Sequence, residues 1–399
     1  MKTARVVIGA NFGDEGKGLV TDFFAAQSGK EALVVRFNGG AQAAHTVVTP
    51  EGKRHVFSHF GSGSLCGSAT FLSRFFVCHP IFFQKEKSLL AGLGASPVTY
   101  VDSRSAITTP YDMMINQIAE ESRGVARHGS CGMGFGETVE RNLHAHFALT
   151  YTDLADKDFL RQRLQKIQQQ WVQLRLQKLG VGDISPVWQQ RLSSQDILEK
   201  FIEDAALFLQ YTQPADADFL EKTKRNIIFE GAQGLLLDQD GKWFPHVTRS
   251  STGLQNALRL AEEAGFDCLD VSYVTRAYAT RHGAGPLPHE LPSAPYAGIQ
   301  DPTNIRNDWQ GALRFGWLDA DLLNETIHHD INKNKSKISV RPELVVTCLD
   351  QLPEKIQIVR NGAVVTRARD DLPKDLAQLL GFQKVRTSRG PTRKTVSQS

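Results

Sequence analysis

The sequence predicts an α/β fold, and three segments near the N-terminus carry this prediction. Residues 5–8 read Arg-Val-Val-Ile, a β-branched run that is typical of a buried strand. A glycine-rich turn follows over residues 9–18, and residues 19–26 carry apolar side chains at helical spacing. Residues 32–37 read Ala-Leu-Val-Val-Arg-Phe, which indicates a second buried strand. The order strand, helix, strand favours a parallel sheet with a right-handed crossover.

A helical region interrupts the sheet pattern in the middle of the chain. Between residues 156 and 210 the chain is rich in Gln and Arg, and a second helical stretch over residues 197–209 follows a break at Pro186. The first stretch has apolar side chains at helical spacing, which are Leu160, Leu164, Ile167, Trp171 and Leu174. We expect an inserted helical subdomain at about residues 151–222.

Strand patterns resume after this insertion, at residues 226–229, 268–274 and 344–347. A chain of 399 residues can form one large domain with insertions or two closely joined domains. We expect a single domain over residues 1–399 that carries the helical insertion.

The composition excludes several classes of protein. With 41% hydrophobic and 22% charged residues the chain has a globular composition, and no apolar run is long enough to span a bilayer. The net charge of +3 is small, and no dense basic stripe supports binding to duplex nucleic acid. The N-terminus lacks a signal-peptide pattern, so a cytoplasmic location is expected. The five cysteines are scattered and favour neither a zinc site nor a disulfide framework.

Residues 13–18 read Gly-Asp-Glu-Gly-Lys-Gly and predict a phosphate-binding loop between the first strand and the first helix. Glycines let backbone N–H groups approach an anion, the helix N-terminus adds partial positive charge, and Lys17 adds a full charge. The loop differs from a Walker loop, because Asn11 and Gly18 stand where a glycine and a Ser or Thr are expected. A purely structural turn is the alternative interpretation.

A second motif follows the loop. Residues 36–46 read Arg-Phe-Asn-Gly-Gly-Ala-Gln-Ala-Ala-His-Thr, and together with residues 13–18 they resemble the signature motifs of the adenylosuccinate synthetases. In that family the aspartate of the first motif deprotonates N1 of the purine. The histidine of the second assists transfer of the γ-phosphoryl group of GTP to the 6-oxygen. The resemblance places Asp14 and His45 in these roles, for which a carboxylate and an imidazole are suited.

Further blocks resemble the family in the same order along the chain. Residues 229–234 read Phe-Glu-Gly-Ala-Gln-Gly, and the resemblance places Gln233 near the reacting oxygen of the purine. Residues 245–248 read Pro-His-Val-Thr, similar to a family segment whose threonine holds the 5′-phosphate of the nucleotide. Other matching blocks are residues 280–286 (Thr-Arg-His-Gly-Ala-Gly-Pro), 349–350 (Leu-Asp) and 388–391 (Ser-Arg-Gly-Pro). Several blocks in order are more specific than one glycine loop.

The resemblance implies a large central, mostly parallel sheet flanked by helices, and a GTP-dependent carbon–nitrogen ligase. In-line transfer with Mg²⁺ would make a 6-phosphoryl purine, and an amine would then displace the phosphate. The implied substrates are a purine nucleoside monophosphate such as IMP, GTP, and L-aspartate or another amino donor. A homodimer is implied as well.

The resemblance also assigns individual residues. The catalytic residues are Asp14, His45, Lys17 and Gln233, and the metal is expected at Asp14 and Ala44. The nucleotide-binding residues are Gly13, Glu15, Gly16, Gly18, Gln42, Ser130, Cys131, Arg141, Thr248, Arg281, Arg314, Asp350, Ser388 and Gly390. Arg141 is the candidate for the family's arginine that reaches across the dimer to the monophosphate.

The segment that corresponds to the family's aspartate-binding loop departs from the family pattern. Residues 307–317 read Asn-Asp-Trp-Gln-Gly-Ala-Leu-Arg-Phe-Gly-Trp, with Arg314 as the one cation. Arginine suits such a loop because its planar fork binds carboxylates in bidentate fashion. Each charge-assisted hydrogen bond that is removed costs about 1.5 to 3 kcal/mol. The amine donor is therefore left open, and Trp309 and Phe315 either pack or line a pocket for an apolar amine.

Other departures affect the nucleotide pockets. Gln42 replaces an asparagine of the family, Cys131 replaces a threonine, and Met133 replaces a polar or charged residue. We interpret Cys131 as a small residue that fills a threonine-shaped site rather than as a reactive thiol. Cys348 stands where the family commonly has a lysine, whereas Asp350 is retained as the acceptor for guanine N–H groups.

Three alternatives stay open at this point. A specialised enzyme of the same type would act on a deoxy purine nucleotide such as deoxy-GMP. A nucleotide-binding regulator would keep the phosphate loop without ligase turnover, although the four catalytic residues would then have no reason to occur together. A kinase or GTP hydrolase would release phosphate without consuming an amine.

Overall fold

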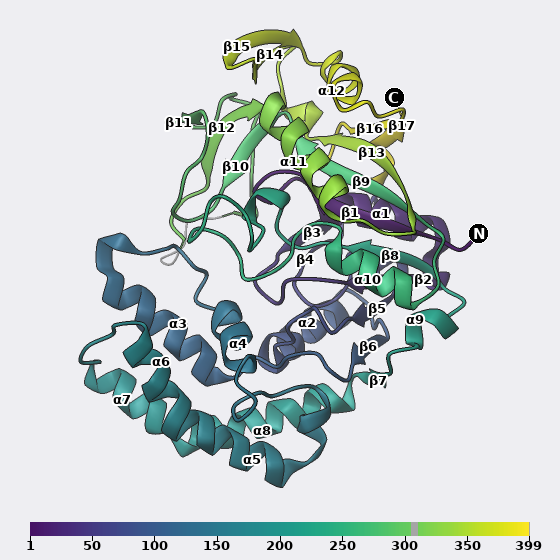
Figure 1. Ribbon diagram of the computed structural model, residues 1–399. Coiled ribbons are helices and arrows are strands. Elements are labelled where there is room, and N and C mark those ends of the chain that lie inside the picture. Colours follow the sequence, from purple (N-terminus) through teal and green to yellow (C-terminus); the bar gives the residue numbers. More distant parts are fainter. Residues whose placement is uncertain (305–309, 399) are drawn as a thin grey trace.

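In the computed structural model, which describes residues 1–304 and 310–398, a mostly parallel sheet forms the centre of the protein (Figure 1). Within these residues the sheet has ten strands, in the order β17-β16-β13-β9-β1-β8-β2-β5-β6-β7. Neighbouring strands are parallel, except that β16 and β17 are antiparallel. The strands are β1 (Thr3–Gly9), β2 (Ala32–Arg36), β5 (Ala69–Leu72), β6 (Thr99–Asp102), β7 (Gln213–Ala215), β8 (Asn226–Glu230), β9 (Cys268–Arg276), β13 (Ser339–Thr347), β16 (Val385–Ser388) and β17 (Val396–Gln398). The predicted α/β fold with a large central sheet is confirmed.

The central strands are buried on both faces, which explains their nearly continuous apolar sequences. In β1, Val6 pairs with Phe229 of β8 on one side and with Val271 of β9 on the other, and all three side chains are fully buried. The predicted crossover helix is α1 (Lys17–Ser28), which joins β1 to β2 across the inserted strand β8. Phe24 of α1 packs in one cluster with apolar side chains of these strands.

A smaller sheet lies beside the central one and was not predicted from the sequence. It has five strands within the described residues, in the order β10-β12-β14-β15 with β11 paired to β12. Its strands are β10 (Tyr278–Arg281), β11 (Glu290–Leu291), β12 (Arg314–Asp319), β14 (Lys355–Arg360) and β15 (Ala363–Ala368). A separate hairpin is formed by β3 (His45–Val48) and β4 (Arg54–Phe57). Both features bring polar residues to the carboxyl edge of the central sheet.

Helices form a layer at one end of the molecule, opposite the β14–β15 hairpin (Figure 1). This layer consists of α2 (Pro80–Gly92), α3 (Pro110–Arg123), α4 (Phe135–Asn142), α5 (Lys157–Lys166), α6 (Val172–Lys178), α7 (Pro186–Ser193) and α8 (Gln195–Gln210). The remaining helices, which are associated with the sheets, are α9 (Phe219–Lys222), α10 (Gln255–Glu263), α11 (Ala320–Lys333) and α12 (Leu372–Leu380). Residues 151–222 are mostly helical, but their apolar side chains share one core with α2 and α3. Within the described residues no helix has the length and apolar character needed to cross a membrane.

The long predicted helix in this layer is interrupted by a π turn over Ile167–Trp171, between α5 and α6. The π turn adds a residue to the helical repeat, so the buried face shifts after it. Leu174, which we predicted on the apolar face, is 54% exposed, and Val172 and Leu176 are buried instead. The break predicted at Pro186 is the beginning of α7, where a proline loses no helical hydrogen bond.

A buried carboxylate joins α11 to the loop before α10. Asp330 accepts hydrogen bonds from the backbone N–H of Leu254 at 3.0 Å and from the hydroxyl of Tyr273 at 2.9 Å. Its side chain approaches Gly253 so closely that a Cβ there would lie 2.0 Å from Oδ1. Burial raises the pKa of Asp330 from 3.8 to about 6, although the hydrogen bonds from Leu254 and Tyr273 oppose this effect.

We expect the ionisation of Asp330 to destabilise the fold. Because the pKa is higher in the folded state, the stabilisation by protonated Asp330 is fully present below the unfolded value and is lost as pH rises through about 6. Between pH 5 and pH 8 the free energy of unfolding should fall by about 1.4 kcal/mol, the energy that corresponds to one pKa unit. Asp330→Asn should remove that part of the pH dependence of the unfolding free energy, measured by urea denaturation. Glu325→Gln, at an exposed position of the same helix, serves as the control, and an unchanged pH dependence in Asp330→Asn would contradict the assignment.

Candidate active site

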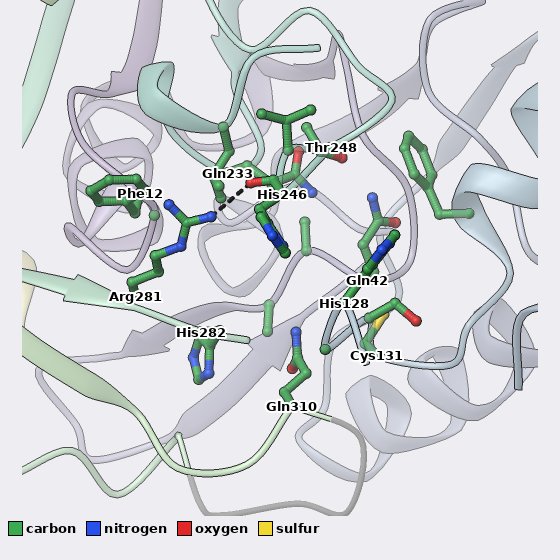
Figure 2. Close-up of a pocket in the computed structure, with 18 of the residues that line it drawn as sticks. Phe12, Gln42, His128, Cys131, Gln233, His246, Thr248, Arg281, His282 and Gln310 are labelled. Carbon is green, nitrogen blue, oxygen red and sulfur yellow. Dashed lines mark hydrogen bonds between the residues drawn. The ribbon is translucent and has the colours of Figure 1, made fainter. Parts of the chain in front are cut away.

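A cavity of about 680 Å³ opens at the carboxyl ends of β1, β2, β8 and β9, and helices α3, α4 and α6 close its other side. This edge of a parallel α/β sheet is where ligands generally bind. Figure 2 shows side chains from several of these segments around one space. The predicted site residues that line the cavity are Gly13, Asp14, Gly16, Lys17, Gly18, Gln42, Ala44, His45, Ser130, Cys131, Gln233, Thr248 and Arg281.

The loop over residues 13–18 is shaped by a buried glutamate. Gly13 and Gly16 have φ values of 101° and 94°, which glycine adopts without strain. The Glu15 carboxylate accepts hydrogen bonds from the backbone N–H groups of Asn11 at 3.0 Å and Gly13 at 2.8 Å. Its other oxygen lies 3.1 Å from Nζ of Lys17. Glu15 is 2% exposed and does not line the cavity, so it supports the loop from behind.

His45 begins strand β3 and is held by a buried carboxylate. Its Nδ1 lies 2.7 Å from Oε1 of Glu230, at the end of β8, and the backbone N–H of Ser62 donates to the other oxygen of Glu230 at 3.0 Å. Because Nδ1 faces a carboxylate, it carries the ring proton, and Nε2 is left buried without a partner among the described residues. Burial lowers the pKa of His45, against the opposing effect of Glu230. For Glu230, burial would raise the pKa, but His45, Arg36 and Ser62 together lower it to about 2.

Asp14 points toward a second histidine. His282 follows β10, and its Nε2 lies 3.2 Å from Oδ2 of Asp14. Burial alone would raise the pKa of Asp14, but the hydrogen bond from His282 and the charges of His282, Arg276 and Lys17 lower it to about 2. Asp14 is therefore an ionised carboxylate at neutral pH.

Two glutamines bring polar atoms to the cavity that have no partner within residues 1–304 and 310–398. Gln233 follows β8 and has a φ of 57°, and its side-chain oxygen is buried without a hydrogen bond. Both polar atoms of the Gln42 side chain are likewise buried and unpartnered among the described residues. Unsatisfied buried polar atoms are uncommon in folded proteins and cost about 1–3 kcal/mol each. A polar ligand in the cavity would supply the missing hydrogen bonds.

The far side of the cavity is formed by loops that cross closely. A Cβ at Gly129 would lie 2.7 Å from the Cα of Gly283, so the loops that carry Ser130 and Arg281 touch through glycines. Arg281 donates to the carbonyl oxygens of His246 and Pro286, both at 2.7 Å, as Figure 2 shows for His246. Burial raises the pKa of Cys131, which favours the thiol over the reactive thiolate.

Two arginines that we predicted as nucleotide ligands are engaged elsewhere. Arg141 is fully buried, with Nε at 2.8 Å from Oδ1 of Asp112, and it also donates to two backbone carbonyls. Within this chain all three guanidinium nitrogens of Arg141 therefore have partners. Arg314 pairs with Glu290 at 2.7 Å and does not line the cavity. The roles of Arg141 and Arg314 as nucleotide ligands therefore stay predictions. Their partners Asp112 and Glu290 are distant in sequence, so the local pattern did not indicate these contacts.

The other predicted residues follow strands of the same sheet but do not line the cavity. Asp350 is exposed in the turn after β13. Ser388 ends β16 and donates to the carbonyl oxygen of Gly390 at 2.8 Å. Phe315 packs against the central core, whereas Trp309 lies outside the described residues.

Several charged residues that line the cavity were not predicted. Arg175 of α6 pairs with Glu137 at 2.6 Å and was hidden in the helical pattern, because nothing in its sequence context indicates a site. His282 lies in the segment over residues 280–286 that resembles the family, and its ionisable side chain could have been recognised as a candidate there. The unpredicted charged or ionisable lining residues include Glu120, Arg123, His128, Glu137, Arg175, His246, Arg249, Arg276, His282 and Asp301.

Comparisons with known proteins indicate the family of this chain. The family model described as adenylosuccinate synthetase matches residues 6–388. A protein named adenylosuccinate synthetase from Thermoplasma acidophilum is 29% identical over 390 residues, which cover 96% of this chain and 84% of that protein. One of the same name from Xanthomonas oryzae pv. oryzae is 32% identical over 337 residues, which cover 81% of this chain and 73% of that protein.

Two solved structures share the fold. The fully ligated adenylosuccinate synthetase from Plasmodium falciparum has a TM-score of 0.76 at 18% identity, covering 100% of this chain and 99% of that chain. The succinoaminodeoxyadenylate synthetase from cyanophage S-2L, bound to dGMP and to dATP as an energy donor, has a TM-score of 0.63 at 15% identity. The match covers 100% of this chain and 95% of that chain. With a family model that matches nearly its whole length, this chain belongs to the adenylosuccinate synthetase family.

Proposed function

We propose that this protein uses GTP to phosphorylate the 6-oxygen of IMP and then replaces the phosphate with the amine of L-aspartate. As a member of the adenylosuccinate synthetase family it is a carbon–nitrogen ligase. The observation that supports the substrates is one cavity that contains an anion-binding loop with Lys17, the carboxylate of Asp14, and the unpartnered polar atoms of His45 and Gln233.

The phosphoryl transfer would take place at the glycine loop. The N-terminus of α1 and Lys17 face the cavity, so they would stabilise negative charge that builds up on the transferring phosphate. Asp14, which is ionised at neutral pH, would accept the proton from N1 of the purine. His45, oriented by Glu230, would present Nε2 to an oxygen of the nucleotide. Gln233 would contact the purine near the 6-oxygen.

Mg²⁺ would bind this site mainly through the phosphates of the substrate, and not through a set of protein ligands alone. Among the described residues no group of three or more His, Cys, Asp or Glu side chains could hold a metal ion. Mg²⁺ usually binds through one or two carboxylates together with substrate phosphates. Asp14 and Ala44 both line the cavity beside the loop and would hold the ion, which would neutralise phosphate charge when bound.

The amine donor would enter beside Asp14, where Arg276, Asp301, Thr303 and Asn304 line the cavity. Arg314 is paired with Glu290 and does not line the cavity. Arg276 is a cation in this part of the cavity, and Asp301 lies 3.6 Å from it. L-Aspartate is the first donor to test for this family.

Phosphate release with GTP and Mg²⁺ tests this function directly. We expect release with IMP only when L-aspartate is present, loss of release when EDTA removes Mg²⁺, and a succinyl adduct on IMP in mass analysis. An adduct on deoxy-GMP alone would instead make the protein a specialised enzyme like the cyanophage relative that binds dGMP. Release that ignores aspartate would indicate another amine or a hydrolase, and no turnover with any nucleotide would refute the ligase assignment.

The Glu230–His45 pair should matter for turnover more than for folding. Glu230→Gln removes the charge that orients and supports His45, so we expect kcat to fall by about 100-fold while KM for GTP changes little. Glu86→Gln is the matched control, because Glu86 is a buried glutamate beside His55 and His59 that does not line the cavity. Equal losses of kcat in both variants, measured by steady-state kinetics, would contradict a catalytic role for the Glu230–His45 pair.

We also propose a cytoplasmic homodimer, as is typical of the family. Sedimentation equilibrium should then give a mass of twice the 44.2 kDa of the chain. A mass of one chain at all concentrations, in a preparation that is active, would show that the site is complete within a protomer.

A further inference from the structure

His282 is a side chain without an assigned role that contacts the proposed base. Its Nε2 lies 3.2 Å from Oδ2 of Asp14 and 3.0 Å from Oδ1 of Asn304. The amide of Asn304 is oriented by its own donation to Oδ2 of Asp301 at 2.8 Å, so the atom that faces His282 is an oxygen. Both partners of Nε2 are therefore acceptors, and Nε2 carries a hydrogen that it shares between them. The other ring nitrogen, Nδ1, is buried without a partner among the described residues.

The backbone around His282 is held on both sides. Arg281 before it is anchored by two carbonyl oxygens and lies over the ring of Phe12, with 4.6 Å from its guanidinium carbon to the ring centroid. Gly283 after it has a φ of 68° and packs against Gly129. Because the neighbouring residues leave little freedom, the imidazole is a fixed donor.

The segment over residues 301–304 is the other element that His282 contacts. Asp301 lies 3.6 Å from Arg276 at the end of β9. The hydroxyl of Thr303 lies 3.0 Å from that of Thr46, which follows His45, and it accepts a hydrogen bond from Arg54 at 2.7 Å. Asp301, Thr303 and Asn304 all line the cavity. The segment is thus tied to the hairpin that begins at His45 and, through His282, to Asp14.

We propose that His282 is a positioning residue of the ligase reaction. Its N–H holds Oδ2 of Asp14, which fixes the orientation of the carboxylate and joins it to residues 301–304. One imidazole N–H thus orders the base together with the 301–304 segment beside it. This inference rests on the proposed function, because the role of Asp14 as a base belongs to that proposal.

The test is the kinetics of His282 variants in the assay with GTP, IMP and L-aspartate. His282→Asn is too short to reach Asp14, and we expect kcat to fall by about tenfold or more, because misplacement of a reacting group by an ångström is costly. KM for GTP should stay within about twofold, since the loop amides and Lys17 bind the triphosphate independently. His282→Gln places an amide N–H near the position of Nε2 and should restore most of kcat.

A matched control is available on the smaller sheet. His289 pairs with Asp319 at the same 3.2 Å, away from the cavity lining. His289→Asn should keep kcat, with the thermal stability of each variant measured in parallel. Equal kcat for His282→Asn and the wild type, or no recovery in His282→Gln, would overturn the positioning role.

A double-mutant cycle tests the connection to the 301–304 segment. If His282 acts on Asp14 together with Asn304, the fold losses of His282→Asn and Asn304→Ala should not multiply in the double variant. Losses that multiply would show that Asn304 acts independently and would overturn the coupling. An inactive wild-type protein would refute the proposed function itself, which is a different outcome from an active wild type with insensitive His282 variants.

Discussion

The buried carboxylate of Glu230 is the constraint on which the site depends. It lies at the end of β8, in the middle of the sheet, with no exposed surface. Burying a charge is costly unless partners compensate for it. The partners are His45, Ser62 and Arg36, whose Nε lies 4.0 Å from the carboxylate. Since these three come from separate segments, compensation of one charge fixes the ends of β2 and β8 and the beginning of β3 relative to one another.

A second buried carboxylate, that of Glu15, holds the glycine-rich loop over residues 13–18 in place. Glu15 forms an ion pair with Lys17 and accepts hydrogen bonds from the backbone N–H groups of Asn11 and Gly13. Gly9 must be glycine, because a Cβ there would lie 2.4 Å from the Glu15 carboxylate. These contacts within the chain hold the loop in place, which reduces the ordering that binding would otherwise require.

The cavity combines this rigid frame with polar atoms that the protein leaves unpaired. The side chains of Gln42, Gln233, His45 and His282 all have buried atoms without partners in the described part of the chain. Three arginines near the cavity have partners in the chain, since Arg175 and Arg249 are paired with glutamates and Arg281 donates to backbone carbonyls. Arg281 nevertheless has a buried Nε without a partner among the described residues.

The sequence by itself determined the α/β class, the phosphate loop and the order of the family blocks, because these depend on the residues within short segments. It also brought Asp14, Lys17, His45 and Gln233 together as candidates, and the structure places them in one cavity. Only the tertiary structure decided which arginines are free, since the pairing of Arg141 with Asp112 and of Arg314 with Glu290 joins segments 20 to 30 residues apart. The contact of His282 with Asp14 spans most of the chain and depends on how the two sheets pack, so no local pattern could have revealed it.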